Sequence, residues 1–171
     1  MATEWNYARW AYETGRGNLK AHLETGDFLL AQANTLLTLL LAGLGGALAM
    51  GSRVFEPAAG VLGWGAAAVA VWLSLVAAVL ARQCIVTRNT QVVDNEPINV
   101  YKPILGLSEE EILSYEIENL QGRINITKAR NEAVARWLDR CRYAAIATPF
   151  SFAVGALGEI ALAEALVRPC V

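Results

Sequence analysis

Three long segments of this chain carry almost no charge, and they constrain the fold more than any other feature. Residues 28–52 and 58–81 contain no charged side chain, and residues 143–167 contain only Glu159 and Glu164. At about 1.5 Å per residue, each segment is long enough to cross a hydrocarbon core of about 30 Å. Because lipid offers no hydrogen bonds to the backbone, spanning segments of this kind are helices. The sequence therefore predicts an all-α membrane protein with three transmembrane helices.

The third segment leaves an alternative open. A helix lying in the membrane interface, or a buried amphipathic helix, would also accommodate Glu159 and Glu164. We favour a crossing because residues 143–158 are uncharged. An acidic residue near the far interface also costs less than one at mid-membrane.

The basic residues predict the orientation of the chain. Three precede the first span, nine lie between Arg82 and Arg142, and only Arg53 and Arg168 fall on the other side. We take the membrane to be a bacterial inner membrane, and the positive-inside rule then puts the N-terminus and residues 83–142 on its cytoplasmic side. The predicted regions are an N-terminal amphipathic helix (1–26), a transmembrane hairpin (27–82), a connector (83–108), a stalk helix (109–142) and a third span with a short periplasmic tail (143–171).

A long cytoplasmic helix is predicted after residue 108. Ser108 and Glu111 have the spacing of a capping box, which marks the start of a helix. Apolar residues then recur at alternating four- and three-residue steps, the a/d pattern of a coiled coil. We expect this helix to oligomerise, to continue into the third span and to bend at a hinge at Pro149, where a backbone hydrogen bond is lost. The predicted seam consists of Leu113, Ile117, Leu120, Ile124, Thr127, Asn131, Val134 and Leu138.

Two polar residues interrupt this seam. A polar a or d position commonly fixes the register and number of helices at some cost in stability, which is how we interpret Thr127 and Asn131. The alternative is a stretch of the helix that faces solvent.

The first span carries a narrow polar stripe. At 100° per residue, Asp27, Ala31, Asn34, Thr38 and Gly45 share one helix face. One hypothesis is a helix–helix packing seam, since small residues allow close approach and Asn or Thr can hydrogen-bond across it. A second is the lining of a water path in a ring of subunits, with Asp27 as an acidic ring at the cytoplasmic mouth. A third is a proton or ion relay. We add Glu159 of the third span as a further pore-lining or gating residue.

The sequence offers little that points to catalysis. The single histidine, His22, has no cluster of partners, the three cysteines share no metal-ligand spacing, and no glycine-rich phosphate loop follows a strand. We therefore expect no enzyme activity, no cofactor and no metal. Since no basic patch is present, we also expect no nucleic-acid partner.

Two stretches resemble a known family. In "NLKAHLETGDFLLAQANTLLTLLLAGLGGAL" (residues 18–48), an Asn-Leu element and an acidic residue precede small residues and the first span. In "SEEEILSYEIENLQGRINITKARNEAVARWLDRCRYAAIATPF" (residues 108–150), a cytoplasmic helix leads into the final span. Together they resemble the transmembrane effector of Pycsar antiphage systems. Phe28 and Leu29 stand where a Lys-Ala pair often follows the acid, and no cyclic-nucleotide-binding domain is recognisable.

The resemblance implies a role in abortive antiviral defence, in which an activated membrane protein collapses the gradient across the inner membrane. Activation would come from a cytoplasmic sensor protein or a cyclic nucleotide. The expected function is thus a homo-oligomeric channel or membrane-disrupting effector. The alternatives are a nonconducting anchor that docks a cytoplasmic partner through its stalk, and a holin-like lysis protein.

Overall fold

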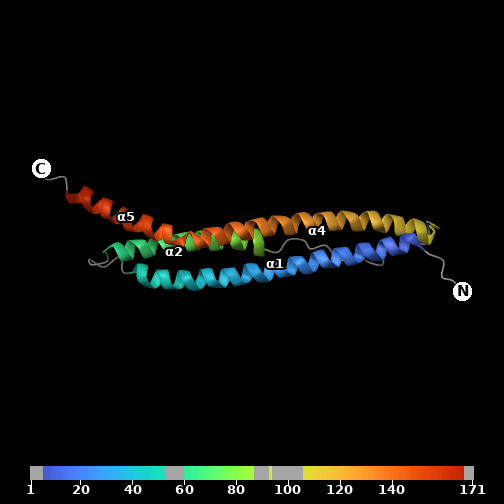
Figure 1. The fold of residues 1–171 in the computed structure, drawn as a ribbon, viewed down its shortest axis with the longest axis horizontal. Helices are drawn as coiled ribbons and strands as arrows, with labels where there is room; N and C mark the ends of the chain where they lie inside the picture. The colour runs from blue at the N-terminus through green and yellow to red at the C-terminus, as the bar shows by residue number, and fades with distance from the viewer. Residues whose placement is uncertain (1–5, 53–59, 87–92, 94–105, 168–171) are drawn as a thin grey trace. The chain divides into compact units, whose positions relative to one another are not determined.

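A computed structural model describes residues 6–52, 60–86, 93 and 106–167 of the chain, and all of its regular structure in these ranges is helical. Figure 1 shows the elements, and the all-α prediction is confirmed for the described residues. They are α1 (Tyr7–Gly51), α2 (Gly60–Leu80), a short π-helical turn η2 (Ala81–Ile85), α4 (Glu109–Ile146) and α5 (Thr148–Val167). The predicted connector 83–108 lies mostly outside the described residues.

Two of the described helices are long and apolar enough to cross a membrane. These are α1 and the helix Gly60–Ile85, which α2 and η2 form together. The bent pair α4 and α5 adds a third if the two are counted as one span. The protein is therefore a helical membrane protein with two or three apolar helices of spanning length.

The predicted boundary between an N-terminal helix and the first span is not a helix end. Residues 7–51 form one helix, α1, that continues through residue 26. Its sequence contains no proline, and a glycine such as Gly26 inside a helix costs only about 1 kcal/mol. Nothing in the sequence is therefore strong enough to end the helix there.

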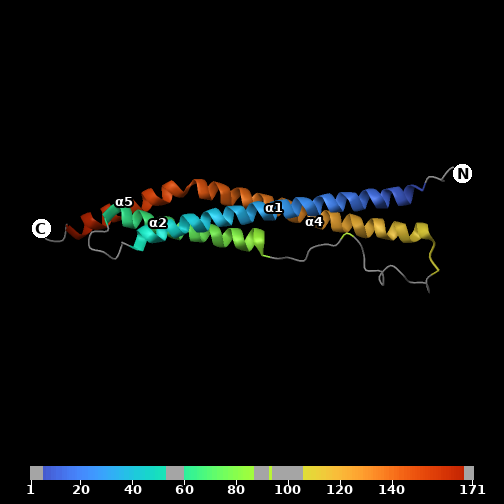
Figure 2. The same ribbon diagram turned by 90° about the horizontal axis from the view of Figure 1, so that it is seen from below.

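The chain divides into two compact units, which we describe separately. The first unit contains α1 up to Leu29 and α4 up to Val134. Figures 1 and 2 show these parts of α1 and α4 side by side and running in the same direction. Contacts at three levels fix this parallel pairing: Arg9 forms an ion pair with Glu109, Gly15 faces Leu120, and the Asn131 amide bonds the His22 carbonyl.

The predicted seam of α4 forms the core of this unit. Leu19 of α1 is fully buried against Leu120 and Ile124 of α4, and Tyr12 and Leu23 pack against the same cluster. The partner of the seam is therefore α1 of the same chain, which our prediction did not include. The sequence predicted a stalk that requires other copies, and whether copies associate remains a prediction.

The capping box at the start of α4 is confirmed. The Ser108 backbone N–H donates to Oε2 of Glu111 at 2.8 Å, and the Glu111 N–H donates to Oγ of Ser108 at 3.3 Å. These hydrogen bonds favour the ionised carboxylate, so they lower the pKa of Glu111 below its ordinary value. The negative charge also lies at the positive end of the helix dipole.

The second unit contains the rest of α1 together with α2, η2, the end of α4, and α5. Glycines bring its helices close together. Gly51 of α1 lies against the backbone of Ala67, and Gly155 of α5 lies against Trp64 and Gly65 of α2. Small residues thus allow close contacts between helices in this unit, as expected of helices that pack in lipid.

A bend of 45° separates α4 from α5 next to Pro149, and whether it is a static bend or a hinge that moves stays a prediction. The predicted continuous helix is interrupted at one residue, Ala147. Pro149 has no N–H to donate to the Ala145 carbonyl, and its ring would clash with that carbonyl in a straight helix. The Thr148 hydroxyl donates to the Ala145 oxygen instead, at 2.6 Å. The backbone acceptor that proline frees is therefore satisfied within the bend.

Candidate functional site

The polar stripe of α1 is exposed throughout its predicted length. None of its residues packs into the core of the chain: Asp27 is exposed in the first unit, and Ala31, Asn34, Thr38 and Gly45 are exposed in the second. A side chain at Gly45 would meet no atom within 4 Å. The structure thus brings these residues together on one helix face, which the described residues leave open.

A different face of α1 makes the contacts inside the second unit. Ala33 and Leu40 are buried there, and Gly51 contacts α2. At 100° per residue this face lies roughly 140° around the helix axis from the stripe. Among the residues that the structure describes, the stripe is therefore not a packing seam. Two hypotheses for the stripe remain predictions: a packing seam between copies of the chain, and the lining of a water path.

Most polar groups in the first half of the apolar segment have partners inside the chain. The hydroxyls of Thr35 and Thr38 donate to the carbonyls of Ala31 and Asn34, each at 3.0 Å. Hydroxyls bonded in this way to their own helix are tolerated in lipid, since they expose no free donor.

Gln32 has a partner that the sequence analysis missed. Its side-chain oxygen accepts a hydrogen bond from the guanidinium of Arg142, which also bonds Asp139 at 3.1 Å. All three residues belong to the second unit. Arg142 is the last basic residue before the third apolar segment, and Gln32 is the first polar residue after Phe28. Both residues lie where a polar part of the sequence meets an apolar segment. This shared position does not by itself predict that they form a hydrogen bond.

Asn34 is the exception among these polar residues. Its side chain is exposed, and no group in the described part of the chain hydrogen-bonds to its carboxamide. Moving an unpaired amide from water to an apolar medium costs roughly 2–7 kcal/mol, depending on the reference state. Its partner is therefore water or another molecule. Asn34 lies only two residues beyond Gln32, so the stripe begins at the polar boundary and continues inward with Thr38 and Gly45.

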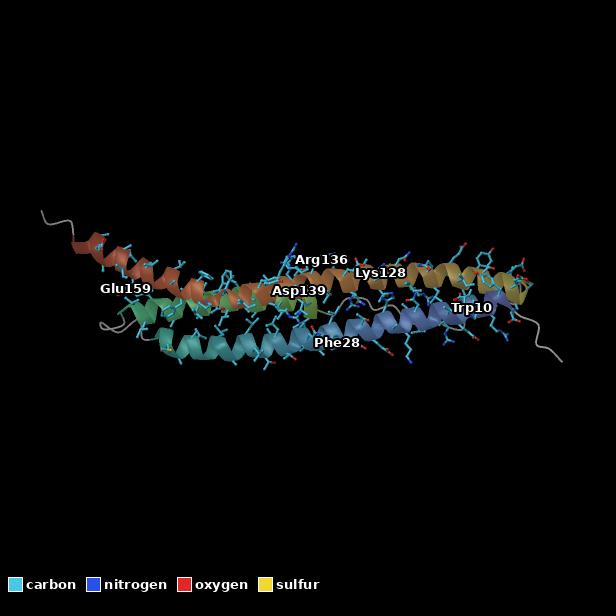
Figure 3. The ribbon with its side chains drawn as sticks, in the orientation of Figure 1. Trp10, Phe28, Lys128, Arg136, Asp139 and Glu159 are labelled. Carbon is cyan, nitrogen blue, oxygen red and sulfur yellow. The ribbon has the colours of Figure 1, made fainter. Side chains whose placement is uncertain are left out.

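Glu159 lies on a different surface from the stripe. It is partly buried on α5, as labelled in Figure 3, one turn after Gly155, whose face packs on α2. Its Oε2 atom is buried and has no hydrogen-bond partner. The described contacts therefore assign Glu159 to the α2-facing side of α5 and not to the exposed face of α1.

The polar seam residues of α4 are both buried and both satisfied. The Thr127 hydroxyl donates to the Arg123 carbonyl at 2.8 Å, and Nδ2 of Asn131 donates to the His22 carbonyl at 2.6 Å. A side chain on Gly26 would come within 3.1 Å of Oδ1 of Asn131, so this glycine makes room for the amide. Asn131 thereby ties one turn of α4 to one turn of α1 and specifies their register.

The described residues contain no group of three or more His, Cys, Asp or Glu side chains that could hold a metal ion. Comparisons with protein-family models, curated proteins and solved structures find no match for this chain.

Proposed function

We propose that this protein is an oligomeric membrane effector whose copies assemble around a polar path lined by α1. The observation that carries the proposal is the stripe Asp27–Asn34–Thr38–Gly45, which is exposed and lies away from the face of α1 that packs inside the chain. A helix face that meets only lipid would be expected to be its most apolar face. Here the exposed leucines Leu41 and Leu48 lie beside the stripe and do not replace it.

The chemistry of the stripe suits a path between copies. Ala31 and Gly45 allow helices to approach closely, and Asn34 offers a carboxamide that water can hydrate. Asp27 would form an acidic ring at the mouth, which favours cations. In this proposal the distribution of basic residues puts the N-terminus and residues 83–142 in the cytoplasm, and the likeness to Pycsar effectors implies a bacterial inner membrane.

The likeness to Pycsar effectors supplies the biological part of the proposal. It implies antiphage defence, with opening triggered by a sensor protein or a cyclic nucleotide, and it depends on the two stretches quoted above. The bend at Pro149 joins α4 to α5, so a movement of the cytoplasmic pair would reach α5 through this hinge. The polar path itself does not depend on the identity of the trigger.

A nonconducting anchor is the second candidate. It is favoured by the seam of α4, which α1 of the same chain already covers with Leu19, Tyr12 and Leu23. A stalk that needs no second copy suits a module that docks a cytoplasmic partner. On this candidate the stripe would serve no conducting role.

Membrane potential and propidium iodide uptake in expressing cells distinguish the two candidates. We expect depolarisation by the wild type, and none by an equally expressed Asn34→Leu, Thr38→Leu double variant. Ser74→Leu is the matched control, because its hydroxyl also bonds a carbonyl four residues earlier, at 2.8 Å, and it is exposed on α2 away from the stripe. This control is expected to depolarise cells like the wild type.

Oligomer mass in detergent is measured on the same variants. Loss of depolarisation with unchanged mass is the result expected of a polar path. A changed mass would instead make the stripe a packing seam. Retained depolarisation in the double variant would refute the path, and an unchanged potential in wild-type cells that carry the trigger would favour the anchor.

A further inference from the structure

A groove runs along the outer surface of the second unit, between α2 and the bent pair α4 and α5. It consists of two adjoining hollows of about 520 and 240 Å³, which share Trp72 and Leu75 as lining residues. Sites that hold small ligands commonly measure roughly 300–1,000 Å³. Every residue that lines the groove belongs to the second unit.

The larger hollow is apolar, with Leu75 of α2 and Phe150 and Val154 of α5 in its walls. Two polar side chains in its lining use their polar atoms inside the chain. The Trp72 indole donates from Nε1 to the Ala144 carbonyl at 2.9 Å, and the Ser151 hydroxyl donates to the Thr148 carbonyl at 2.7 Å. The groove therefore presents hydrocarbon to its occupant.

The length of the groove matches one leaflet of a membrane. Its lining on α2 extends from Ala68 to Val79, which at 1.5 Å per residue is about 16 Å. Half of a hydrocarbon core of about 30 Å is about 15 Å. An extended acyl chain that enters at one interface would fill this length.

One end of the groove is cationic. The smaller hollow is lined by Trp137 and Arg140 of α4, with the Arg140 guanidinium 4.8 Å from the centre of the indole ring. Arg82 on η2 is exposed one turn beyond Val79, and it is the first charged residue after the uncharged α2. Asp139, the only acidic residue of this turn of α4, bonds Arg142. Figure 3 shows Arg136 and Asp139 on the same stretch of α4.

We propose that this groove binds a phospholipid with an anionic headgroup. One acyl chain lies along Trp72, Leu75, Phe150 and Val154, and the phosphate meets the guanidinium of Arg140, with Arg82 nearby on η2. The apolar lining faces the lipid phase, the cations stand where the apolar helix ends, and tryptophan at that level suits the membrane interface. Basic pockets between transmembrane helices are a known way to hold anionic headgroups.

The lipid site goes beyond the proposed effector function and does not depend on it. Lipid binding is measured on the purified chain, whereas conduction is measured in cells, so either proposal can fail without the other. The site would give the bent segment of α4 and α5 a contact with the membrane that varies with lipid composition.

Native mass spectrometry of the purified full chain in detergent, titrated with phosphatidylglycerol or phosphatidylcholine, tests the site. We expect the wild type to bind phosphatidylglycerol more tightly. Arg140→Gln should weaken that binding about fivefold, since one basic residue near an anionic lipid is worth about that factor. Lys128→Gln, which removes an exposed charge elsewhere on α4, should leave it unchanged.

A second pair of variants tests the apolar part of the groove. Val154→Trp should fill the groove and lower the affinity for phosphatidylglycerol, whereas Leu157→Trp on α5, similarly exposed but outside the lining, should not. Circular dichroism shows that each variant is folded before its lipids are counted. Equal binding of both lipids by the wild type, equal effects of Arg140→Gln and Lys128→Gln, or unchanged binding by Val154→Trp would each overturn the proposal. Dimers in place of lipid adducts would assign the groove to a second copy.

Discussion

The contact between α5 and α2 at Gly155 predicts a large penalty for one added methyl group. A Cβ atom on Gly155 would lie 2.6 Å from the Trp64 carbonyl oxygen and 2.7 Å from Cβ of Ala68. Ordinary contacts of this kind are 3.4–4 Å, so the overlap is at least 0.7 Å. The nearest obstacle is backbone, which cannot swing aside, and the two helices must separate. Overpacking of this kind typically costs about 1–3 kcal/mol.

Gly158→Ala provides a matched control three residues further along α5. A Cβ atom at Gly158 would meet nothing within 4 Å. Both substitutions gain the same helix propensity, about 1 kcal/mol for Gly to Ala. The difference between the two variants therefore isolates the overpacking term. Gly155→Ala is expected to be less stable than Gly158→Ala by about 1–3 kcal/mol.

Unfolding of both variants in mixed micelles of increasing SDS content, followed by far-UV circular dichroism, measures this difference. Gly65→Ala supplies an intermediate case. Its Cβ atom would meet the ring of Phe152 at 2.5 Å, and a side chain can rotate away where a carbonyl cannot. The expected order of stability is Gly158→Ala, then Gly65→Ala, then Gly155→Ala. Coincident unfolding curves for Gly155→Ala and Gly158→Ala would refute the close approach of α5 to α2.

Two further predictions concern the first unit. Asn131→Asp should be destabilised by about 3 kcal/mol relative to Asn131→Leu, because both variants lose the donor to the His22 carbonyl but only the aspartate buries a charge; equal unfolding midpoints would contradict the burial of this position. The pKa of Glu111 is lowered in the folded protein, so its ionised carboxylate stabilises the start of α4 fully at pH values above the ordinary carboxyl pKa. This stabilisation is lost as the pH falls through the lower pKa of the folded state. The protection of the amides at the start of α4, measured by hydrogen exchange relative to the intrinsic rate at each pH, should therefore fall in acid in the wild type, and Glu111→Gln, which keeps the capping geometry, should remove that dependence.

Local chemistry made several parts of this fold predictable from sequence. The capping box depends on Ser108 and Glu111 alone, and the bend depends on Pro149 removing one backbone donor, so neither needs tertiary information. The burial of Leu120, Ile124 and Leu138 follows in the same way from an a/d spacing.

The partner of the seam could not be predicted in this way. An a/d pattern states that a face is buried, and it does not state what covers it. The covering face of α1 contains Gly15 and Gly26, whose lack of a side chain makes room for Leu120 and Asn131. The amphipathic face of this helix could be predicted from the sequence, but its periodicity does not state which helix covers it. The length of α1 was missed for a related reason, since the change from charged to apolar residues near Asp27 resembles a boundary although the backbone continues.

For the candidate stripe, too, the periodicity of the sequence identifies a helix face but not what that face contacts. The periodicity that grouped Asn34, Thr38 and Gly45 is real, and in the structure it marks a face that the chain does not bury. The Thr38 hydroxyl is satisfied by its own helix, so it would tolerate lipid, and Gly45 would tolerate any neighbour. Within the apolar segment, Asn34 alone on this face requires a polar partner. The choice between a water path and a seam between copies therefore depends mainly on what the Asn34 carboxamide meets, which is why its replacement by leucine is the decisive change.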